Sequence, residues 1–269
     1  MMIDIHSHIL PGLDDGAKDM ETALRMAQMA VEDGIDKMIA TPHLFRGGYP
    51  SKGIEGIERT RKEFIQKLEE NSIPLEIFPG AEVHISHNLI KEARENRETL
   101  VLNKSRYMFI EFPSEHVFSG IKDLIFELKT QAIIPIIAHP ERNSFFRHHP
   151  EFLSELLRMG ALSQVNQGSF NGIYGSGPRE AVHRFLELGF VHFIATDCHN
   201  TWVIQPLLSK ALKKAGEIIG EENARALVED NPWCVIEDKG LSYNPVPQEA
   251  KAKKKTFNIK LPSFIKKKS

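Results

Sequence analysis

Short apolar runs alternate with longer amphipathic stretches along most of the chain, which is the pattern of repeated strand–helix units. In the first long stretch Ala23, Met26, Ala27 and Ala30 share one helical face. We predict strands at 2–5, 37–40, 75–79, 107–111, 133–138, 162–166 and 191–196. We predict helices at 17–33, 54–71, 88–96, 120–131, 151–159, 179–188, 205–219 and 221–230. The last helix is expected to stop at Asn231-Pro232, because the residue before a proline disfavours helix.

This order of elements predicts an α/β protein with a parallel sheet and helices outside it. Seven strands joined by short right-handed crossovers predict a closed or nearly closed barrel. We find no internal break, so residues 1–245 are expected to form one catalytic domain. Residues 246–269 have little periodic apolar content, and we interpret them as a basic, flexible tail.

Charge is divided unevenly between these two parts. The net charge is −2, and residues 246–269 carry eight lysines and one glutamate, or +7, so residues 1–245 carry −2 − 7 = −9. An acidic body argues against nucleic acid as the main ligand. No apolar run approaches the ~20 residues needed to cross a bilayer. Cys198 and Cys234 are the two cysteines, too few for a disulfide framework, so we expect a cytoplasmic protein.

Metal-ligating residue types recur where the predicted strands end. His6 and His8 follow the first strand and project to the same side, because side chains alternate along an extended chain. Asp197 and His199 repeat this spacing at the last strand. The full set of candidate metal ligands is His6, His8, Asp15, His43, Glu82, Glu111, His139, Asp197 and His199.

Each of these residues alone has an ordinary explanation. A single histidine before proline is as often a loop residue bonded to backbone, and a single glutamate is often a helix cap or half of an ion pair. Five imidazoles and four carboxylates at one barrel mouth are different, because their desolvation is costly unless cations compensate it. Imidazole and carboxylate ligands without thiolate suit manganese, iron or zinc. Together the nine residues predict a metal centre.

The motifs DIHSHILPGLDDGA, ATPHLF, GAEVHI, IEFP, AHPER and TDCHN resemble the polymerase and histidinol phosphatase (PHP) superfamily over residues 1–235. They are most similar to its bacterial manganese-dependent protein-tyrosine phosphatase branch, associated with capsule and exopolysaccharide synthesis. The resemblance implies a distorted (β/α)7 barrel with three metal ions. By that similarity the first ion is held by His6, His8, Glu82 and Asp197, the second by Glu82, Glu111 and His139, and the third by Asp15, His43 and His199.

The expected reaction is hydrolysis of phosphotyrosine by a metal-activated hydroxide. Arg142 is expected to clamp the phosphate with its planar fork of donors, the alternative being a surface ion pair. Either Asp15 or His199 is expected to protonate the leaving tyrosine. The branch often carries an arginine shortly after the Asp-x-His-Asn stretch. Here the stretch is followed by residues 201–205 without one, and Ile204 lies among them, so Arg46 or Arg147 is a possible substitute.

A cysteine-based mechanism does not fit the sequence. It requires an arginine six residues after the nucleophile, and Cys198 is followed there by Ile204 and Cys234 by Gly240. The main alternatives are a small-molecule phosphatase, such as a histidinol-phosphate phosphatase, and a non-catalytic regulatory module on the same barrel. The expected partner is a phosphotyrosyl protein, such as a membrane-associated bacterial tyrosine kinase. The basic tail is a candidate for peripheral membrane contact, and liposome binding unchanged by deleting residues 247–269 would reject that role.

Overall fold

The computed structural model describes residues 1–50, 52–86 and 88–249. Its strands are β1 (Met2–Ser7), β2 (Ile35–Ala40), β3 (His43–Leu44), β4 (Glu76–Pro79), β5 (Glu82–His84), β6 (Tyr107–Glu111), β7 (Ile134–Ala138), β8 (Leu162–Asn166) and β9 (Phe193–Ala195). The helices are α1 (Met20–Glu32), α2 (Gly53–Glu70), α3 (Leu89–Glu95), α4 (Arg97–Leu100), η1 (Leu102–Lys104), α5 (Ile121–Thr130), α6 (Ser144–His148), α7 (Pro150–Arg158), α8 (Gln167–Phe170), α9 (Ser176–Glu187), α10 (Ser209–Ile219), α11 (Glu221–Ala226) and α12 (Asp230–Ile236).

All pairings between these strands are parallel, and the strands form two sheets, β1-β2-β4 and β3-β5-β6-β7-β8-β9. The chain passes from the first sheet to the second after β2 and again after β4, and between these two points the connection through α2 returns it to the first sheet. Pro42 lies between β2 and β3, and Gly80 lies between β4 and β5. A Cβ at Gly80 would lie 2.6 Å from Ile39 Cγ2, so only glycine allows this close approach. Among the described residues the strands therefore occupy seven positions around the ring.

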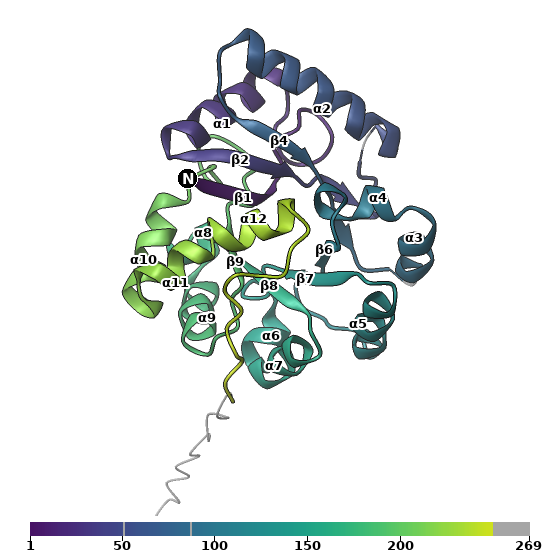
Figure 1. The fold of residues 1–269 in the computed structure, drawn as a ribbon, viewed down its shortest axis with the longest axis vertical. Coiled ribbons are helices and arrows are strands. Elements are labelled where there is room, and N and C mark those ends of the chain that lie inside the picture. The colour runs from purple at the N-terminus through teal and green to yellow at the C-terminus, as the bar shows by residue number, and fades with distance from the viewer. Residues whose placement is uncertain (51, 87, 250–269) are drawn as a thin grey trace, which may run out of the picture.

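Backbone hydrogen bonds join the first strand to the segment after the last. His8 N donates to Cys198 O at 3.0 Å, and Asp197 N donates to His6 O at 2.9 Å. The buried carboxylate of Asp4 accepts from both the backbone N–H and the hydroxyl of Thr196. These contacts close the ring, visible in Figure 1, and the predicted (β/α)7 barrel is confirmed.

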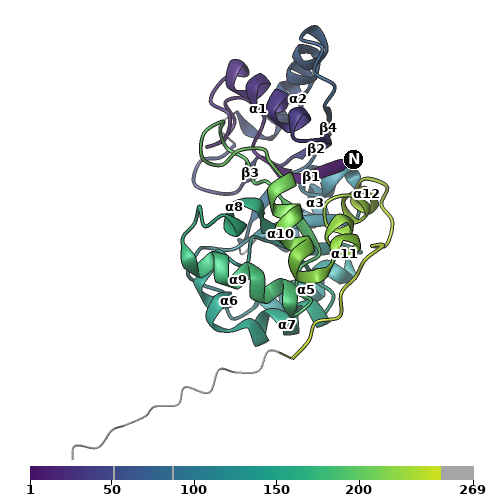
Figure 2. The same ribbon diagram turned by 90° about the vertical axis from the view of Figure 1, so that its left-hand side faces the viewer.

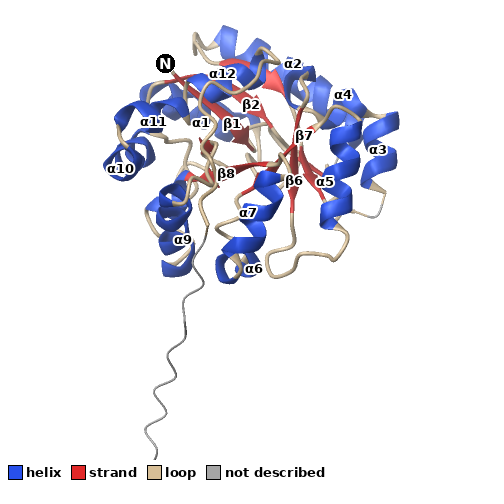
Figure 3. Cartoon of the chain, turned by 60° about the horizontal axis from the view of Figure 1, so that its bottom comes forward, coloured by secondary structure: helices blue, strands red, loops and turns tan. Residues whose placement is uncertain are grey.

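Helices surround the strands on the outside (Figure 3). In Figure 2, α1 and α2 lie with β2 and β4 at one end of the molecule, and α5, α6, α7 and α9 lie at the other. The barrel interior is filled by an apolar cluster that includes Ile5, Phe109 and Phe193. Val235 and Ile236 of α12 belong to the same cluster, so α12 packs against the barrel interior. The interior is a packed core and not a channel, which leaves the carboxyl ends of the strands for chemistry.

Several predicted boundaries are corrected by the structure. His6 and Ser7 lie within β1 and not after it. The helix predicted at 221–230 begins where α11 begins, but its predicted end is wrong: α11 ends at Ala226, and a separate helix, α12, runs through Asn231-Pro232. Pro232 is accepted there because it lies in the first turn of α12, where its missing N–H has no intrahelical partner to lose.

In the part of the chain that the structure describes, no helix is long and apolar enough to cross a bilayer. The first residues of the predicted tail contact the domain, since Gln248 N donates to Leu188 O at 2.9 Å. The rest of the predicted tail, residues 250–269, lies outside the described residues.

Candidate metal centre

The nine predicted ligands lie at or just after the carboxyl ends of the strands, and they converge on one site. Eight of them are buried or nearly so, whereas Asp15, in the loop after β1, has a side chain that is 42% exposed. Eight of the nine, all except His139, form three overlapping groups, and within each group the ligand atoms lie within 4.8 Å of one another. The groups are His6, His8, Glu82 and Asp197; His8, Asp15, His43 and His199; and His43, Glu82 and Glu111.

The first group lies deepest. His6 Nε2 is 3.4 Å from Glu82 Oε1 and 3.4 Å from Asp197 Oδ1. His8 Nε2 is 3.4 Å from Glu82 Oε2 and 3.3 Å from Asp197 Oδ1. Two donor atoms that share an ion at about 2.0–2.2 Å are separated by roughly 3.0–3.5 Å. The observed spacings therefore fit ligands of a common cation.

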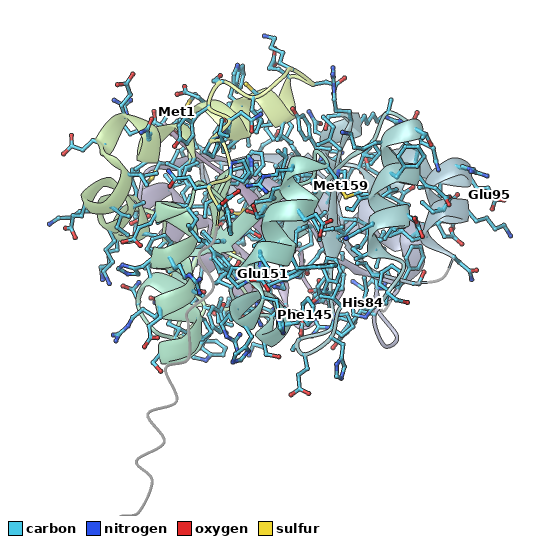
Figure 4. The ribbon with its side chains drawn as sticks, turned by 90° about the horizontal axis from the view of Figure 1, so that it is seen from below. Met1, His84, Glu95, Phe145, Glu151 and Met159 are labelled. Carbon is cyan, nitrogen blue, oxygen red and sulfur yellow. The ribbon has the colours of Figure 1, made fainter. Side chains whose placement is uncertain are left out.

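His43 links the other two groups through its two ring nitrogens. Its Nδ1 is 2.9 Å from Glu82 Oε2 and 3.6 Å from Glu111 Oε2, and its Nε2 is 3.3 Å from Asp15 Oδ1. His139 contacts Glu82 at 2.9 Å, although it is not grouped with Glu111. His84, which Figure 4 labels, lies 3.2 Å from Glu111 Oε2 through its Nδ1. Glu82 is thus the carboxylate shared by two of the three groups.

Buried polar atoms that lack a hydrogen-bond partner indicate whether these residues are suited to bind a cation. His6 Nε2, His8 Nε2, His43 Nδ1 and Glu82 Oε2 are buried and form no hydrogen bond with any described residue. Buried polar atoms are rarely left without partners. These four atoms belong to the grouped ligands, which is the arrangement expected if their partner is a divalent ion.

Neighbouring side chains orient two of the imidazoles. Gln164 Nε2 donates to Asn166 Oδ1 at 2.8 Å, which leaves Gln164 Oε1 to accept the Nδ1 proton of His6 at 2.9 Å. His8 donates its Nδ1 proton to Asp14 Oδ2 at 2.8 Å. In both rings the Nε2 lone pair is then directed toward Glu82 and Asp197. Such outer partners fix the tautomer and orientation of metal-ligating histidines.

The buried carboxylates of the cluster are stabilised by positive charge beside them, as the pKa shifts of His6 and Glu82 show. Burial alone would lower the pKa of His6, but the Glu82 and Asp197 carboxylates outweigh it and raise the pKa to about 9. Burial would raise the pKa of Glu82, yet His6, His139 and His43 hold it well below its usual range. Carboxylates this deeply buried require cations beside them, whether imidazolium or metal ions.

Backbone conformation also marks the site. His139 has φ 33° and directly follows β7. Asp197 has φ 50° and is the second residue after β9. Non-glycine residues rarely adopt the left-handed region, and such strain concentrates at functional sites. The positive φ values set the directions in which these two side chains leave their strands.

Arg142 lies at the rim of this cluster. Its Nη1 donates to Asp197 Oδ2 at 2.7 Å, and its guanidinium carbon is 4.4 Å from the ring centroid of Tyr174. The side chain is 35% exposed, so it lies between the buried carboxylate and solvent. This position disfavours the alternative of a simple surface ion pair.

The two arginines considered as substitutes behave differently. Arg46 Nη1 contacts His43 and lies 3.5 Å from Glu111 Oε1 and 4.0 Å from Asp15 Oδ2. Arg147 instead donates through Nη1 to the carbonyl oxygens of Glu141 and Arg142. Arg46 therefore belongs to the site, whereas Arg147 supports the backbone of the turn that carries Arg142.

Sequence reasoning missed the contributions of β8. Gln164 and Asn166 are separated by one residue at the end of that strand, so they share a face in the same way as His6 and His8. That alternation was the available signal. Amides are not metal ligands of the expected kind, and β8 was therefore left without a candidate. Tyr174 carried no signal, because it lies in the turn between α8 and α9 and not at the end of a strand.

A seven-stranded parallel barrel with buried imidazoles and carboxylates at its carboxyl ends defines a metal-dependent hydrolase site. The family model for capsular polysaccharide synthesis, CpsB/CapC, matches residues 2–237. The chain therefore belongs to the CpsB/CapC family. It is 36% identical to the tyrosine-protein phosphatase YwqE of Bacillus subtilis over 253 residues, which are 94% of this chain and 98% of the relative.

Solved structures agree with the family. One from a study of YwqE from Bacillus subtilis and CpsB from Streptococcus pneumoniae, called unique metal-dependent tyrosine phosphatases, is 35% identical and superimposes with a TM-score of 0.87. That match covers 93% of this chain and all of the other. The histidinol phosphate phosphatase of Lactococcus lactis is 15% identical, with a TM-score of 0.52 over 80% of this chain and 94% of its own. The second likeness concerns the fold alone.

Proposed function

We propose that this chain is a metal-dependent protein-tyrosine phosphatase that hydrolyses phosphotyrosine on a protein acting in capsule or exopolysaccharide synthesis. Support comes from the convergence of nine ligand-type side chains at one barrel mouth and from the tyrosine phosphatases in its family. The observation that carries the proposal is the set of buried ligand atoms without hydrogen-bond partners among the described residues.

Three divalent ions, with manganese as the proposed species and iron or zinc as alternatives, are assigned to the three groups of side chains. Neutral imidazole and carboxylate ligands suit these metals. We assign His6, His8, Glu82 and Asp197 to one ion, and Glu82 with Glu111, His43 or His139 to a second. Asp15, His43 and His199 would hold the third. When bound, such ions lower the pKa of a coordinated water toward 7 and stabilise charge on phosphoryl oxygens.

In this proposal two arginines bind the phosphate from different loops. Arg142 presents its donors at the rim beside Asp197, and Arg46 does so beside Asp15 and Glu111. Planar guanidinium groups bind phosphate oxygens in pairs, which orients the phosphorus atom as well as holding it. Arg46 would thereby provide the second arginine contact in a chain that has Ile204 after its Asp-x-His-Asn stretch.

Departure of tyrosine makes modest demands on a general acid, because a phenol has a pKa of ~10. Burial would raise the pKa of Asp15, but hydrogen bonds from His199 and His43 hold it well below its usual range. Asp15 is therefore ionised at neutral pH, which suits a metal ligand better than a proton donor. His199 is assigned to the third ion as well, so we keep both residues as candidates for protonating the leaving group.

The partner is proposed to be a phosphotyrosyl protein, such as a membrane-associated bacterial tyrosine kinase, encountered in the cytoplasm. Cys198 and Cys234 are both free and buried, as is usual in a reducing compartment.

The decisive experiment combines metal analysis with substrate comparison. The purified protein should contain bound metal and hydrolyse a phosphotyrosyl peptide far faster than histidinol phosphate, and a chelator should abolish turnover. His8→Ala and Asp197→Ala should lose both metal and activity. A preference for histidinol phosphate would support the small-molecule alternative. Metal binding without turnover of either substrate would support the regulatory module.

A further inference from the structure

A groove between α3 and α5 is lined by apolar side chains. The two helices lie side by side (Figure 1), and the groove has a volume of about 350 Å³. Its lining includes Ile90 of α3 and Leu124 of α5, together with Ile85 after β5 and Phe118 before α5. Phe118 is 38% exposed. Exposed apolar surface gathered in this way is typical of an interaction site.

The charged side chains of this groove are acidic. Asp123 and Glu127 are exposed, lie about one turn apart on α5, and form no ion pair with any described residue. No lysine or arginine is found among the described residues that line the groove. Phe126, three residues from Asp123, adds an apolar ring that is 65% exposed. The surface is therefore complementary to a segment that is both apolar and cationic.

Residues 250–269 of this chain, which lie outside the described ranges, have that composition. Phe257, Ile259 and Leu261 alternate with polar residues, so in an extended conformation these three side chains, here called the apolar run, would share one face. Lys260 lies within the run, and seven other lysines lie on either side of it.

The last described residues lie close to the groove. Arg158 Nη2 donates to Pro247 O at 3.3 Å, and Lys129 Nζ, near the end of α5, donates to Met159 O at 2.7 Å. The chain at Pro247 is therefore near the carboxyl end of α5. Residues 250–256 span about 23 Å when extended, whereas the whole of α5 is only about 15 Å long. The apolar run can therefore reach the groove.

A second hollow, on α6 and α7, is less suited to this segment. Its carboxylates already have partners, since Glu151 Oε1 lies 3.3 Å from His149 Nδ1 and Glu155 Oε1 lies 2.6 Å from Lys122 Nζ. Arg158 adds a positive charge to its lining. The groove between α3 and α5 is thus favoured by charge.

We propose that the apolar run docks in the groove between α3 and α5 of the same chain, with neighbouring lysines paired to Asp123 and Glu127. Burial of apolar side chains supplies most of the attraction, and the ion pairs weaken as the salt concentration rises. This docking goes beyond the proposed hydrolysis and does not depend on it. Lysines paired in the groove are not available to an anionic membrane surface.

Tryptic cleavage after Lys260 in the full-length chain measures the docking, because a protease cleaves the open form of a segment. We expect Asp123→Asn combined with Glu127→Gln to speed this cleavage about 5-fold. Phe257→Ser should speed it by about 5-fold or more, because the buried ring is lost. Each rate is normalised to cleavage of a synthetic peptide with the same sequence as residues 250–269.

The matched control is Glu55→Gln combined with Glu63→Gln. Both glutamates are exposed on α2, at the other end of the molecule (Figure 2), and the substitutions remove the same charge. The control should cleave at the wild-type rate.

Cross-linking with a carbodiimide, which joins a lysine amine directly to a carboxylate, locates the docked segment. Peptide mass spectrometry should find links from residues 250–269 to Asp123 or Glu127 within one chain.

Wild-type cleavage rates in both groove variants would overturn the proposal, and so would links spread evenly over the carboxylates of α2 and α5. Links found only between chains would assign the groove to a second copy. Protection of Lys260 that requires anionic vesicles would assign the segment to a membrane surface. Either result would contradict docking within one chain.

Discussion

Asp14 is important because it holds the imidazole of His8, a proposed metal ligand. It accepts the His8 Nδ1 proton at 2.8 Å and also accepts from the backbone N–H groups of Gly16 and His43. A charged acceptor in this position raises the basicity of the imidazole and fixes its orientation. Asp14 therefore acts on the metal centre through His8 and the first loop.

We expect Asp14→Asn to weaken manganese binding about 10- to 100-fold while leaving the fold intact. Metal titration followed by calorimetry measures this directly. Asp33→Asn is a suitable control, since among the described residues that carboxylate accepts from Leu208 and Ser209, at the start of α10 and away from the site. Equal manganese affinity in Asp14→Asn and the wild type would show that Asp14 has no orienting role.

His192 is a buried histidine outside the metal centre, and it makes stability depend on pH. Ser163 N donates to its Nδ1 at 3.2 Å, and burial lowers the pKa of the ring to about 4. In the unfolded chain the pKa is about 6.5. The neutral ring therefore contributes fully above pH 6.5, and stability is lost as the pH falls from about 6.5 to about 4, by roughly 3 kcal/mol.

Urea unfolding at pH 7 and pH 4 should show this loss. His192→Asn keeps an acceptor for Ser163 N but does not titrate, so its free energy of unfolding should fall by about 3 kcal/mol less than that of the wild type between these pH values. The difference between the two proteins isolates His192 from the other titrating groups. Parallel losses would contradict the assignment.

At the scale of single residues, the sequence identified the proposed ligands but not the groups that orient them. The spacing of His6 and His8 predicts that they share a site, because a strand places alternate residues on one face. Asp14 is not among the residues that the sequence predicts for the site, and Gln164 reaches His6 across 158 positions of sequence. Such pairings depend on strand order and register, which periodicity does not encode.

Among the helices, the start of α6 is fixed by one side chain, that of Asn143. Asn143 Oδ1 accepts from Phe146 N at 3.1 Å as the helix cap, and its Nδ2 donates to Pro113 O at 2.7 Å. The same residue thus starts the helix and ties the turn carrying Arg142 to the loop after β6. The cap contact is buried, and the contact with Pro113 is partly buried.

Asn143→Ala is expected to lower the free energy of unfolding by about 2 kcal/mol, from the lost cap and the unpaired Pro113 carbonyl. Chemical denaturation measures the change. Asn88→Ala provides the comparison, because Asn88 precedes α3 but makes no side-chain capping hydrogen bond. A similar effect of both substitutions would argue against the cap.

The positions of most helices and strands were predictable from the sequence. The points where a predicted element is divided into two were not. The predicted strand at 75–79 ends where β4 ends, yet nothing in the pattern showed that Glu82 begins a further strand, β5, in the other sheet. Strands of two or three residues are too short for a period of two to be recognised. The helix through Pro232 was missed because proline stops a helix in its interior but starts one in its first turn.

For the whole molecule, ions bound at the proposed metal centre are expected to stabilise the fold. The proposed ligands come from β1 and the loop after it, from β3, β5 and β6, and from the segments after β7 and β9, so bound ions would connect distant parts of the ring. Ligands that bind only the folded state add RT ln(1 + [L]/Kd), or about 2.7 kcal/mol at 100 times Kd.

Chelation should therefore lower the Tm by roughly 5–10 °C for a chain of this size. Differential scanning calorimetry with and without a chelator measures the shift. His8→Ala should respond much less to the chelator, since it lacks a ligand common to two of the three groups. An unchanged Tm in the wild type after verified metal removal would contradict a structural contribution from the ions.

The burial of both thiols has a consequence for how such an enzyme responds to oxidants. Cys198 is fully enclosed and Cys234 is nearly so, and neither lies among the proposed ligands. Phosphatases that attack with a thiolate are silenced when peroxide converts that sulfur to a sulfenic acid. A chain built in this way has no such sulfur to lose, and its dephosphorylating capacity during peroxide stress would depend on manganese supply instead of thiol reduction.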